Sequence, residues 1–223
     1  MLLRLSFLID QIQKKPVNVL ILCSYDEKTK DLARRACLLV DDFYMSPVLM
    51  AEDVDIYLPR SRMSNIWVAR ENRRPHQGSI QVFEGNKLVQ SKDFRSEKDF
   101  GQEIARITRS YRQSFLRETI LKKVLILSKW ANVILFLKNK ELGRGGDCIE
   151  LGILYARAMY RSSMILSKVH VIQRRSVKTC VLMEEIIKDG NITRLKFRKI
   201  KEYENIIVKL IDKSILSQIR GRI

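Results

Sequence analysis

The chain contains few of the residues that mark linkers, disulfide scaffolds and catalytic histidines. Its 223 residues include 9 glycines, 4 prolines, 4 cysteines and 2 histidines. So few glycines and prolines argue against long flexible linkers. His76 and His170 cannot be combined by spacing with an acid and a nucleophile into a triad. No run approaches the roughly 18 uninterrupted apolar residues of a membrane span, so we expect no membrane partner.

The four cysteines lie far apart in the chain, at Cys23, Cys37, Cys148 and Cys180. Three of them have apolar surroundings, in which a thiol behaves as a small hydrophobic group. Because no CxxC motif or Cys/His cluster is present, the sequence predicts neither a metal site nor a disulfide framework. The start, MLLRLSFLIDQIQKK, lacks the cleavage pattern of a signal peptide. We therefore expect an intracellular, cytoplasmic protein.

Positive charge is abundant: the net charge is +17 and the isoelectric point is near 9.9. A field of this sign attracts polyanions, and nucleic acid is the obvious candidate partner. The alternative is a proteome rich in lysine and arginine, in which charges decorate solvated surfaces. The candidate phosphate contacts are seven arginines, Arg60, Arg62, Arg70, Arg73, Arg74, Arg109 and Arg112.

Strands and helices alternate in the hydrophobic pattern. Apolar runs predict strands at 17–23, at 48–50 with 54–57, and at 133–137, 168–173, 179–183 and 194–198. Helical spacing predicts helices at 28–44, 97–130 (one bent helix or two in series), 148–160 and 201–219. This alternation predicts the α/β class, with a Rossmann-like (flavodoxin-like), doubly wound domain and a mainly parallel sheet.

We expect one domain over residues 1–223 with amphipathic helices at both ends. Its segments are an N-terminal helix (1–15), a first β-α-β unit (16–58), a basic loop and hairpin insertion (59–95), a long helix with the second half of the sheet (96–200) and a C-terminal helix (201–223). The hairpin turn is Glu84-Gly85-Asn86, and Pro59–Pro75 is expected to be irregular.

The segment Lys129–Tyr155 carries most of the chemical information. Its apolar run stops at a turn with Gly145, Gly146 and Asp147, and Glu150 follows near the start of a helix. Parallel sheets bind ligands where strands end and helices begin, and glycines allow close approach to an anion. Glu150 can accept a sugar hydroxyl or act as a nucleophile. The alternative is that Asp147 or Glu150 only complements the helix dipole.

The same segment, ANVILFL…GRGGDCIELGILYARA, resembles the signature of the nucleoside 2-deoxyribosyltransferase-like superfamily. TIR and TIR-like domains carry a related arrangement of strand, loop and glutamate. The positions that match are Gly146, Glu150, Leu151, Gly152 and Ala156. The resemblance implies that Glu150 attacks a sugar C1′ or supports cleavage of a nicotinamide–ribose bond. It also implies a substrate loop after the first strand, here Ser24, Tyr25 and Asp26.

The chain departs from that signature at Asn132 and Lys138, where relatives carry acids, and at Asp147, where they carry threonine. We expect a protein that binds a nucleotide, a nucleoside or an NAD-like ligand and cleaves or transfers an N-glycosidic bond through Glu150. Whether it is an enzyme stays open. The alternatives are a basic nucleic-acid-binding protein without activity and a catalytically degenerate structural or oligomerisation module. The resemblance favours a homo-oligomer, because this superfamily often builds its sites between subunits.

Overall fold

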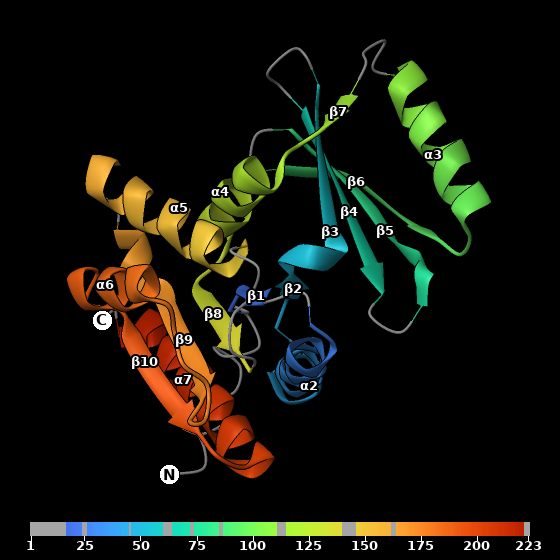
Figure 1. The fold of residues 1–223 in the computed structure, drawn as a ribbon. Helices are drawn as coiled ribbons and strands as arrows, with labels where there is room; N and C mark the ends of the chain where they lie inside the picture. Colours follow the sequence, from blue (N-terminus) through green and yellow to red (C-terminus); the bar gives the residue numbers. More distant parts are fainter. Residues whose placement is uncertain are drawn as a thin grey trace. The chain divides into compact units, whose positions relative to one another are not determined.

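The computed structural model describes residues 17–23, 26–44, 46–59, 64–71, 74–84, 87–110, 115–139, 146–161 and 164–220. The chain divides into two compact units (Figure 1). We call residues 1–50 and 125–223 the parallel-sheet unit, and residues 51–124 the inserted unit. The inserted unit is larger than the insertion predicted at 59–95, and it has its own sheet and core; the single domain over 1–223 stays a prediction. The predicted N-terminal helix at 1–15 lies outside the described residues.

The parallel-sheet unit contains five parallel strands in the order β10-β9-β8-β1-β2. The strands are β1 (Val19–Cys23), β2 (Val48–Met50), β8 (Val133–Lys138), β9 (Val169–Arg174) and β10 (Thr193–Phe197). The helices are α2 (Glu27–Tyr44), α4 (Ile120–Trp130, which enters from the inserted unit), α5 (Gly146–Arg161), η2 (Met164–Lys168), α6 (Val181–Asp189) and α7 (Ile200–Arg220). Every residue of β1 and β8 is buried, which explains their continuous apolar sequences.

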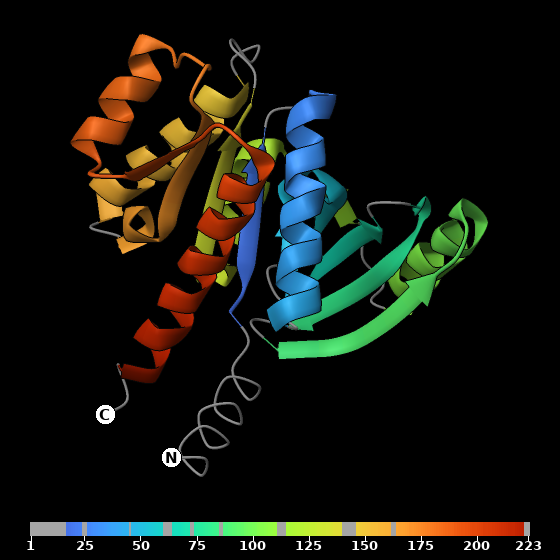
Figure 2. The ribbon, with the colours of Figure 1, turned by 90° about the horizontal axis from the view of Figure 1, so that it is seen from below.

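One face of this sheet is covered by α2 and α7, which lie side by side in front of the strands in Figure 2. Alternate residues of β1 and β8 point to these helices and join one core with them. The buried hydroxyl of Tyr203 in α7 donates a hydrogen bond of 2.7 Å to the carbonyl oxygen of Leu32 in α2. Helices α2 and α7 are thus joined by packing and by a buried polar contact.

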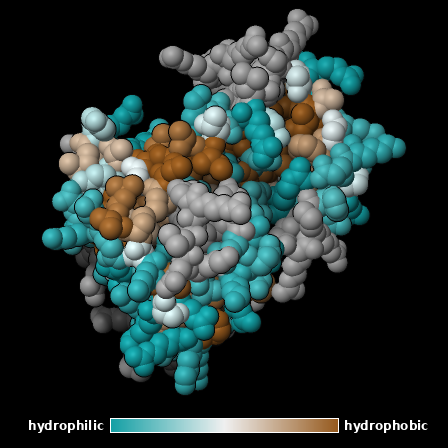
Figure 3. Space-filling model, in the orientation of Figure 1, coloured by the Kyte–Doolittle hydropathy of each residue, from teal (hydrophilic) through white to brown (hydrophobic). Residues whose placement is uncertain are grey.

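The opposite residues of β8 point away from that core. Lys138, the last residue of β8, places its Nζ 3.8 Å from the Sδ of Met183 in α6. Helix α5 packs against α6, and a Cβ on Gly152 would lie 3.9 Å from the Cδ1 of Ile186. Exposed apolar side chains, among them Ile149, Val181 and Leu182, lie on these two helices, where Figure 3 shows brown surface.

The inserted unit is an antiparallel sheet in the order β6-β5-β4-β3-β7. Its elements are η1 (Ala51–Asp53), β3 (Val54–Pro59), β4 (Ser64–Glu71), β5 (Arg74–Glu84), β6 (Lys87–Phe94), α3 (Glu97–Ser110) and β7 (Phe115–Arg117). Helix α3 packs its apolar stripe on one sheet face, where Ile66, Val68, Ile80 and Val82 lie. The hairpin predicted around Glu84-Gly85-Asn86 is confirmed by the pairing of β5 with β6.

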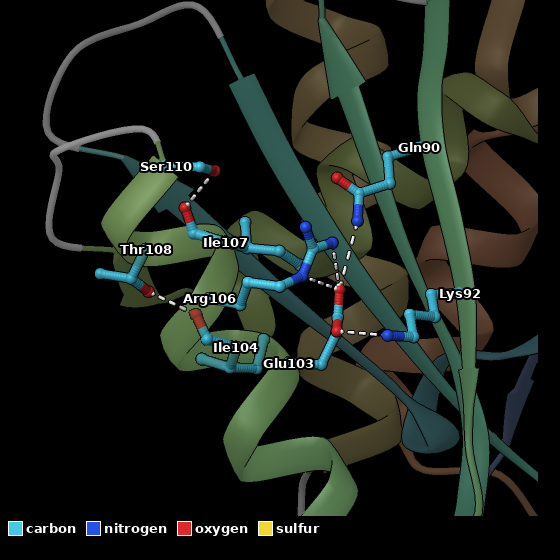
Figure 4. A network of polar contacts seen from close by, with 8 residues as sticks. All are labelled: Gln90, Lys92, Glu103, Ile104, Arg106, Ile107, Thr108 and Ser110. Atoms are coloured by element: carbon cyan, nitrogen blue, oxygen red, sulfur yellow. Dashed lines mark hydrogen bonds and ion pairs between the residues drawn. The ribbon is translucent and has the colours of Figure 1, made fainter.

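A polar network ties α3 to this sheet (Figure 4). The carboxylate of Glu103 is buried and accepts hydrogen bonds from Gln90 at 3.2 Å and Lys92 at 2.9 Å. Arg106 donates to the same carboxylate at 2.5 and 3.0 Å. The hydrogen bonds from Arg106 outweigh burial and, with Lys92, lower the pKa of Glu103 to about 2. The carboxylate of Glu103 thus joins α3 to Gln90 and Lys92 of β6.

Three further predictions need correction. Val54–Tyr57 belongs to the antiparallel sheet and does not extend β2, because η1 turns the chain between them. Thr179–Met183 is not a strand: α6 begins at Val181, and its buried residues have helical spacing. Pro59–Pro75 contains β4, in which Trp67 packs on Phe83 with ring centroids 4.9 Å apart.

Two other features complete the description of the fold. The helix predicted over 97–130 is two helices, α3 and α4, with β7 between them. In the described part of the chain, no helix is both long enough and apolar enough to cross a bilayer.

Candidate functional site

The carboxyl ends of the five parallel strands lie at one edge of the sheet. The order of the strands reverses next to β1, since β2 pairs with one side of it and β8 with the other. In α/β proteins, ligands bind at the carboxyl edge of the sheet where the strand order reverses. Both loops that the sequence singled out, after β1 and after β8, begin at this place.

Glu150 lies on the protein-facing side of α5. Its side chain is 6% exposed, whereas the preceding Ile149 is 54% exposed. Leu151 and Leu154, on the same side of the helix, are fully buried. As predicted, Glu150 lies near the start of a helix: α5 begins at Gly146, so Glu150 is its fifth residue and starts the second turn. The stabilisation of a negative charge by the helix dipole fades beyond the first turn. Complementing the dipole is therefore a weak explanation for a carboxylate at position 150.

Asp26, after β1, caps helix α2. Its Oδ1 accepts a hydrogen bond of 3.0 Å from the backbone N–H of Thr29, and its Oδ2 accepts one of 2.7 Å from the Thr29 hydroxyl. This arrangement is that of an N-cap residue. The amide of Asn139, just beyond β8, donates to the carbonyl oxygen of Lys28 at 3.1 Å and so links the two loop regions. The role of Asp26 toward a substrate stays a prediction.

The remaining residues of the predicted site are only partly described. Ser24, Tyr25 and Gly145 lie outside the described residues, and Gly146 and Asp147 are described as backbone in the first turn of α5. The structure therefore brings together, at this edge, the capped start of α2 and the start of α5 with Glu150 on its buried side.

A buried cation lies at the same edge, and the sequence alone did not assign it to the site. Lys138 is 2% exposed and ends a strand that is otherwise entirely apolar. Its neighbour in the register, Gln173, is also buried and donates a hydrogen bond to the carbonyl oxygen of Val177. The sequence signal for this residue was a lysine at the end of an apolar run. Burial of an ammonium group is costly without partners, so a lysine at the end of a buried strand is unusual.

Two cysteines meet beside Lys138. The Sγ atoms of Cys148, in the first turn of α5, and Cys180, just before α6, are 2.9 Å apart. Both are thiols and both are partly exposed. Treating most of the cysteines as isolated small hydrophobic groups therefore missed this pair. No local signal showed the pair, because the start of α6 was predicted as a strand and the approach depends on the pairing of β8 with β9.

Exposed basic residues extend this edge toward β10. They follow β9 and β10, or end β9, and are Arg174, Arg175, Lys178, Arg198 and Lys199. The two groups adjoin, because the backbone N–H of Arg175 donates to the carbonyl oxygen of Phe197 at 2.8 Å. We call these five residues the basic cluster. Several positive charges at the edge where the loops open favour an anionic ligand.

The arginines of the nucleic-acid alternative do not form a described cluster. Arg70 forms an ion pair with Glu97 at 2.6 Å and lies over the rings of Phe94 and Phe100. Arg109 is exposed in the last turn of α3. The side chains of the other five, Arg60, Arg62, Arg73, Arg74 and Arg112, lie outside the described residues.

No group of three or more His, Cys, Asp or Glu side chains that could hold a metal ion occurs among the side chains that the structure describes. The arrangement at the sheet edge thus provides a buried carboxylate, a buried ammonium group, two adjacent thiols and surface cations.

Comparison of the chain with protein-family models gives no match, and neither does comparison with curated proteins.

Proposed function

We propose that the chain binds a nucleotide or nucleoside at the carboxyl edge of the parallel sheet and cleaves or transfers its N-glycosidic bond through Glu150. The observation that carries the proposal is the burial of Glu150 on the protein-facing side of α5, directly after β8. Its low exposure supports the proposal, because a carboxylate sheltered from bulk solvent at this edge is suited to a chemical role.

We infer that the parallel-sheet unit is a doubly wound, Rossmann-like domain of the flavodoxin type. Counting only the strands of this sheet along the chain, their order is 2-1-3-4-5, which is the flavodoxin order. Placement of α2 and α7 together on one face supports the same inference. In this fold class the ligand lies at the reversal of strand order, which here is between β1 and β8.

The proposed chemistry needs one carboxylate as nucleophile. Its oxygen forms a bond to the sugar C1′ while the bond from C1′ to the base nitrogen breaks, and the base leaves with that electron pair. Water or a second base then attacks C1′, gives up its proton to solvent and releases the carboxylate, while a departing base that carries a negative charge takes up a proton from solvent. The resemblance to deoxyribosyltransferase-like and TIR-like proteins assigns this role to position 150.

The cations at the edge would serve binding. The basic cluster supplies positive charge for a phosphate group, and Lys138 supplies a buried charge near the start of α5. Neither is needed for a neutral nucleoside. A preference for phosphorylated over unphosphorylated substrates is therefore the expected pattern of affinity.

The test is to incubate the purified protein with NAD and with deoxynucleosides and to measure released base by chromatography, with ligand binding followed by calorimetry. We expect the wild type to bind and to release base, and Glu150→Gln to bind without release. Glu185→Gln, which removes an exposed carboxylate from α6, is the matched control and should behave as the wild type. The proposal fails if the wild type neither binds a nucleotide nor releases a base.

A further inference from the structure

The two cysteines at the sheet edge are brought together by the topology. β8 and β9 are adjacent parallel strands, and each is followed by a helix that starts at the same edge. Cys148 is the third residue of α5, and Cys180 directly precedes α6. Their sulfur atoms are 2.9 Å apart although the residues are 32 positions apart in sequence.

The surroundings of the pair favour a thiolate. Both sulfurs lie at helix N-termini, whose N–H groups stabilise negative charge. Burial opposes ionisation of Cys180, but a hydrogen bond with Cys148, the backbone N–H of Met183 and the positive charge of Lys138 together lower its pKa. Lys138 is buried at the end of β8, so solvent screens its positive charge less than that of a surface lysine.

The other two cysteines provide an internal contrast. Cys23 and Cys37 are buried in the core between the sheet and α2, whereas Cys148 and Cys180 are partly exposed. Thiol reactivity requires both thiolate character and access, so the two pairs should differ sharply.

We propose that Cys148 and Cys180 form a redox-active dithiol that exchanges with small-molecule disulfides of the glutathione type and closes to an intramolecular disulfide. This reactivity is separate from the proposed chemistry of Glu150. A disulfide bond is about 2.05 Å long, so the sulfurs need to approach by less than about 1 Å.

The exchange proceeds in two displacements. The Cys180 thiolate attacks one sulfur of glutathione disulfide, which breaks the S–S bond and releases one glutathione thiolate. Cys148 then loses its proton to solvent, and its thiolate attacks the Cys180 sulfur and releases the second glutathione thiolate. Two electrons pass from the protein dithiol to glutathione disulfide, and two glutathione molecules leave after taking up protons.

The test is to equilibrate the folded protein with mixtures of glutathione and its disulfide, quench with acid, alkylate the remaining thiols and identify them by peptide mass spectrometry. We expect the Cys148–Cys180 disulfide to form while Cys23 and Cys37 remain thiols until the protein is denatured. Circular dichroism verifies that the protein stays folded. A wild type that keeps all four thiols in excess glutathione disulfide, or pairs other cysteines, overturns the proposal.

Single variants separate the roles of the two thiols. Cys148→Ser removes the second displacement, so a mixed disulfide with glutathione should accumulate on Cys180. Cys180→Ser should react at least 10-fold more slowly than the wild type, because the thiol whose pKa is lowered is gone. Cys37→Ala is the matched control and should leave the rate unchanged. Equal rates for Cys148→Ser and Cys180→Ser would contradict the assignment of Cys180 as the attacking thiol. If a variant does not fold, the disulfide identified in the wild-type protein still tests the proposed dithiol.

Discussion

Loss of the charge on Glu103 should destabilise the inserted unit, and the loss should depend on pH. The carboxylate is buried and accepts hydrogen bonds from Arg106, Lys92 and Gln90. Because the hydrogen bonds from Arg106 outweigh burial, with Lys92 adding to them, its pKa falls from an ordinary 4.5 to about 2. Glu103→Gln keeps the size of the side chain and removes only the charge.

The magnitude follows from that difference in pKa. A carboxyl group with a pKa of about 2 when folded and 4.5 when unfolded contributes about 3 kcal/mol to the free energy of unfolding. The side chains of Lys92 and Arg106 are each 56% exposed, so solvent screening lowers the expected value to about 2 kcal/mol. Because the folded pKa is the lower one, this stabilisation is complete above pH 4.5 and is lost as the pH falls from 4.5 toward 2.

The assay is urea unfolding followed by Trp67 fluorescence in a Trp130→Phe background, so that the signal comes from the inserted unit. We expect the free energy of unfolding of Glu103→Gln to be lower than that of the wild type by about 2 kcal/mol at pH 7. At pH 3 the difference should shrink to about 1 kcal/mol or less. Glu97→Gln, which removes an exposed carboxylate from the same helix, should have a much smaller effect. An equal difference between wild type and Glu103→Gln at both pH values refutes this reasoning.

Three further predictions concern the parallel-sheet unit. Tyr203→Phe should lower its stability to urea by about 1 kcal/mol, because the hydrogen bond from the hydroxyl to the carbonyl oxygen of Leu32 is lost; an unchanged midpoint would rule this out. Oxidation of Cys148 and Cys180 should raise the free energy of unfolding by about 3–4 kcal/mol, because it closes a loop with a sequence separation of 32, and the difference should vanish when both are serine. Lys138→Met should slow the reaction of Cys180 with glutathione disulfide several-fold, since a nearby cation is lost; an unaltered rate would show that Lys138 does not tune the thiol.

The elements of the parallel sheet were predictable because local sequence and burial agree. Val133–Lys138 is apolar for five residues and fully buried, and Val19–Cys23 has the same character. Predicted helices were correct where apolar residues recur at helical spacing, as in α2. The edge strand β10 was also placed correctly, at Thr193–Phe197.

Other features depend on contacts between distant segments. The apolar Val181 and Leu182 favour a strand locally, but burial of Met183, Ile186 and Ile187 against neighbouring elements selects a helix. The arginine-rich segment around Trp67 was predicted to be irregular but forms strand β4. Its pairing with β3 and β5, which lie elsewhere in the sequence, determines this structure.

The candidate site shows the same division. The prediction of Glu150 as a site residue rests on a local pattern, a strand followed by a glycine turn, and its role stays a prediction. The approach of Cys148 to Cys180 and the burial of Lys138 result from the pairing of β8 with β9, which the linear sequence does not specify.

The rate of base release by Glu150→Gln, relative to wild type and to Glu185→Gln, tests the central claim most directly. With a saturating nucleotide substrate, we predict that wild type and Glu185→Gln release base at the same rate. Glu150→Gln should be slower by about 10³-fold or more while it still binds the substrate, because only the nucleophile is lost. Release of base by Glu150→Gln at the wild-type rate would contradict the assignment of Glu150 and, with it, the proposed reaction at this edge of the sheet.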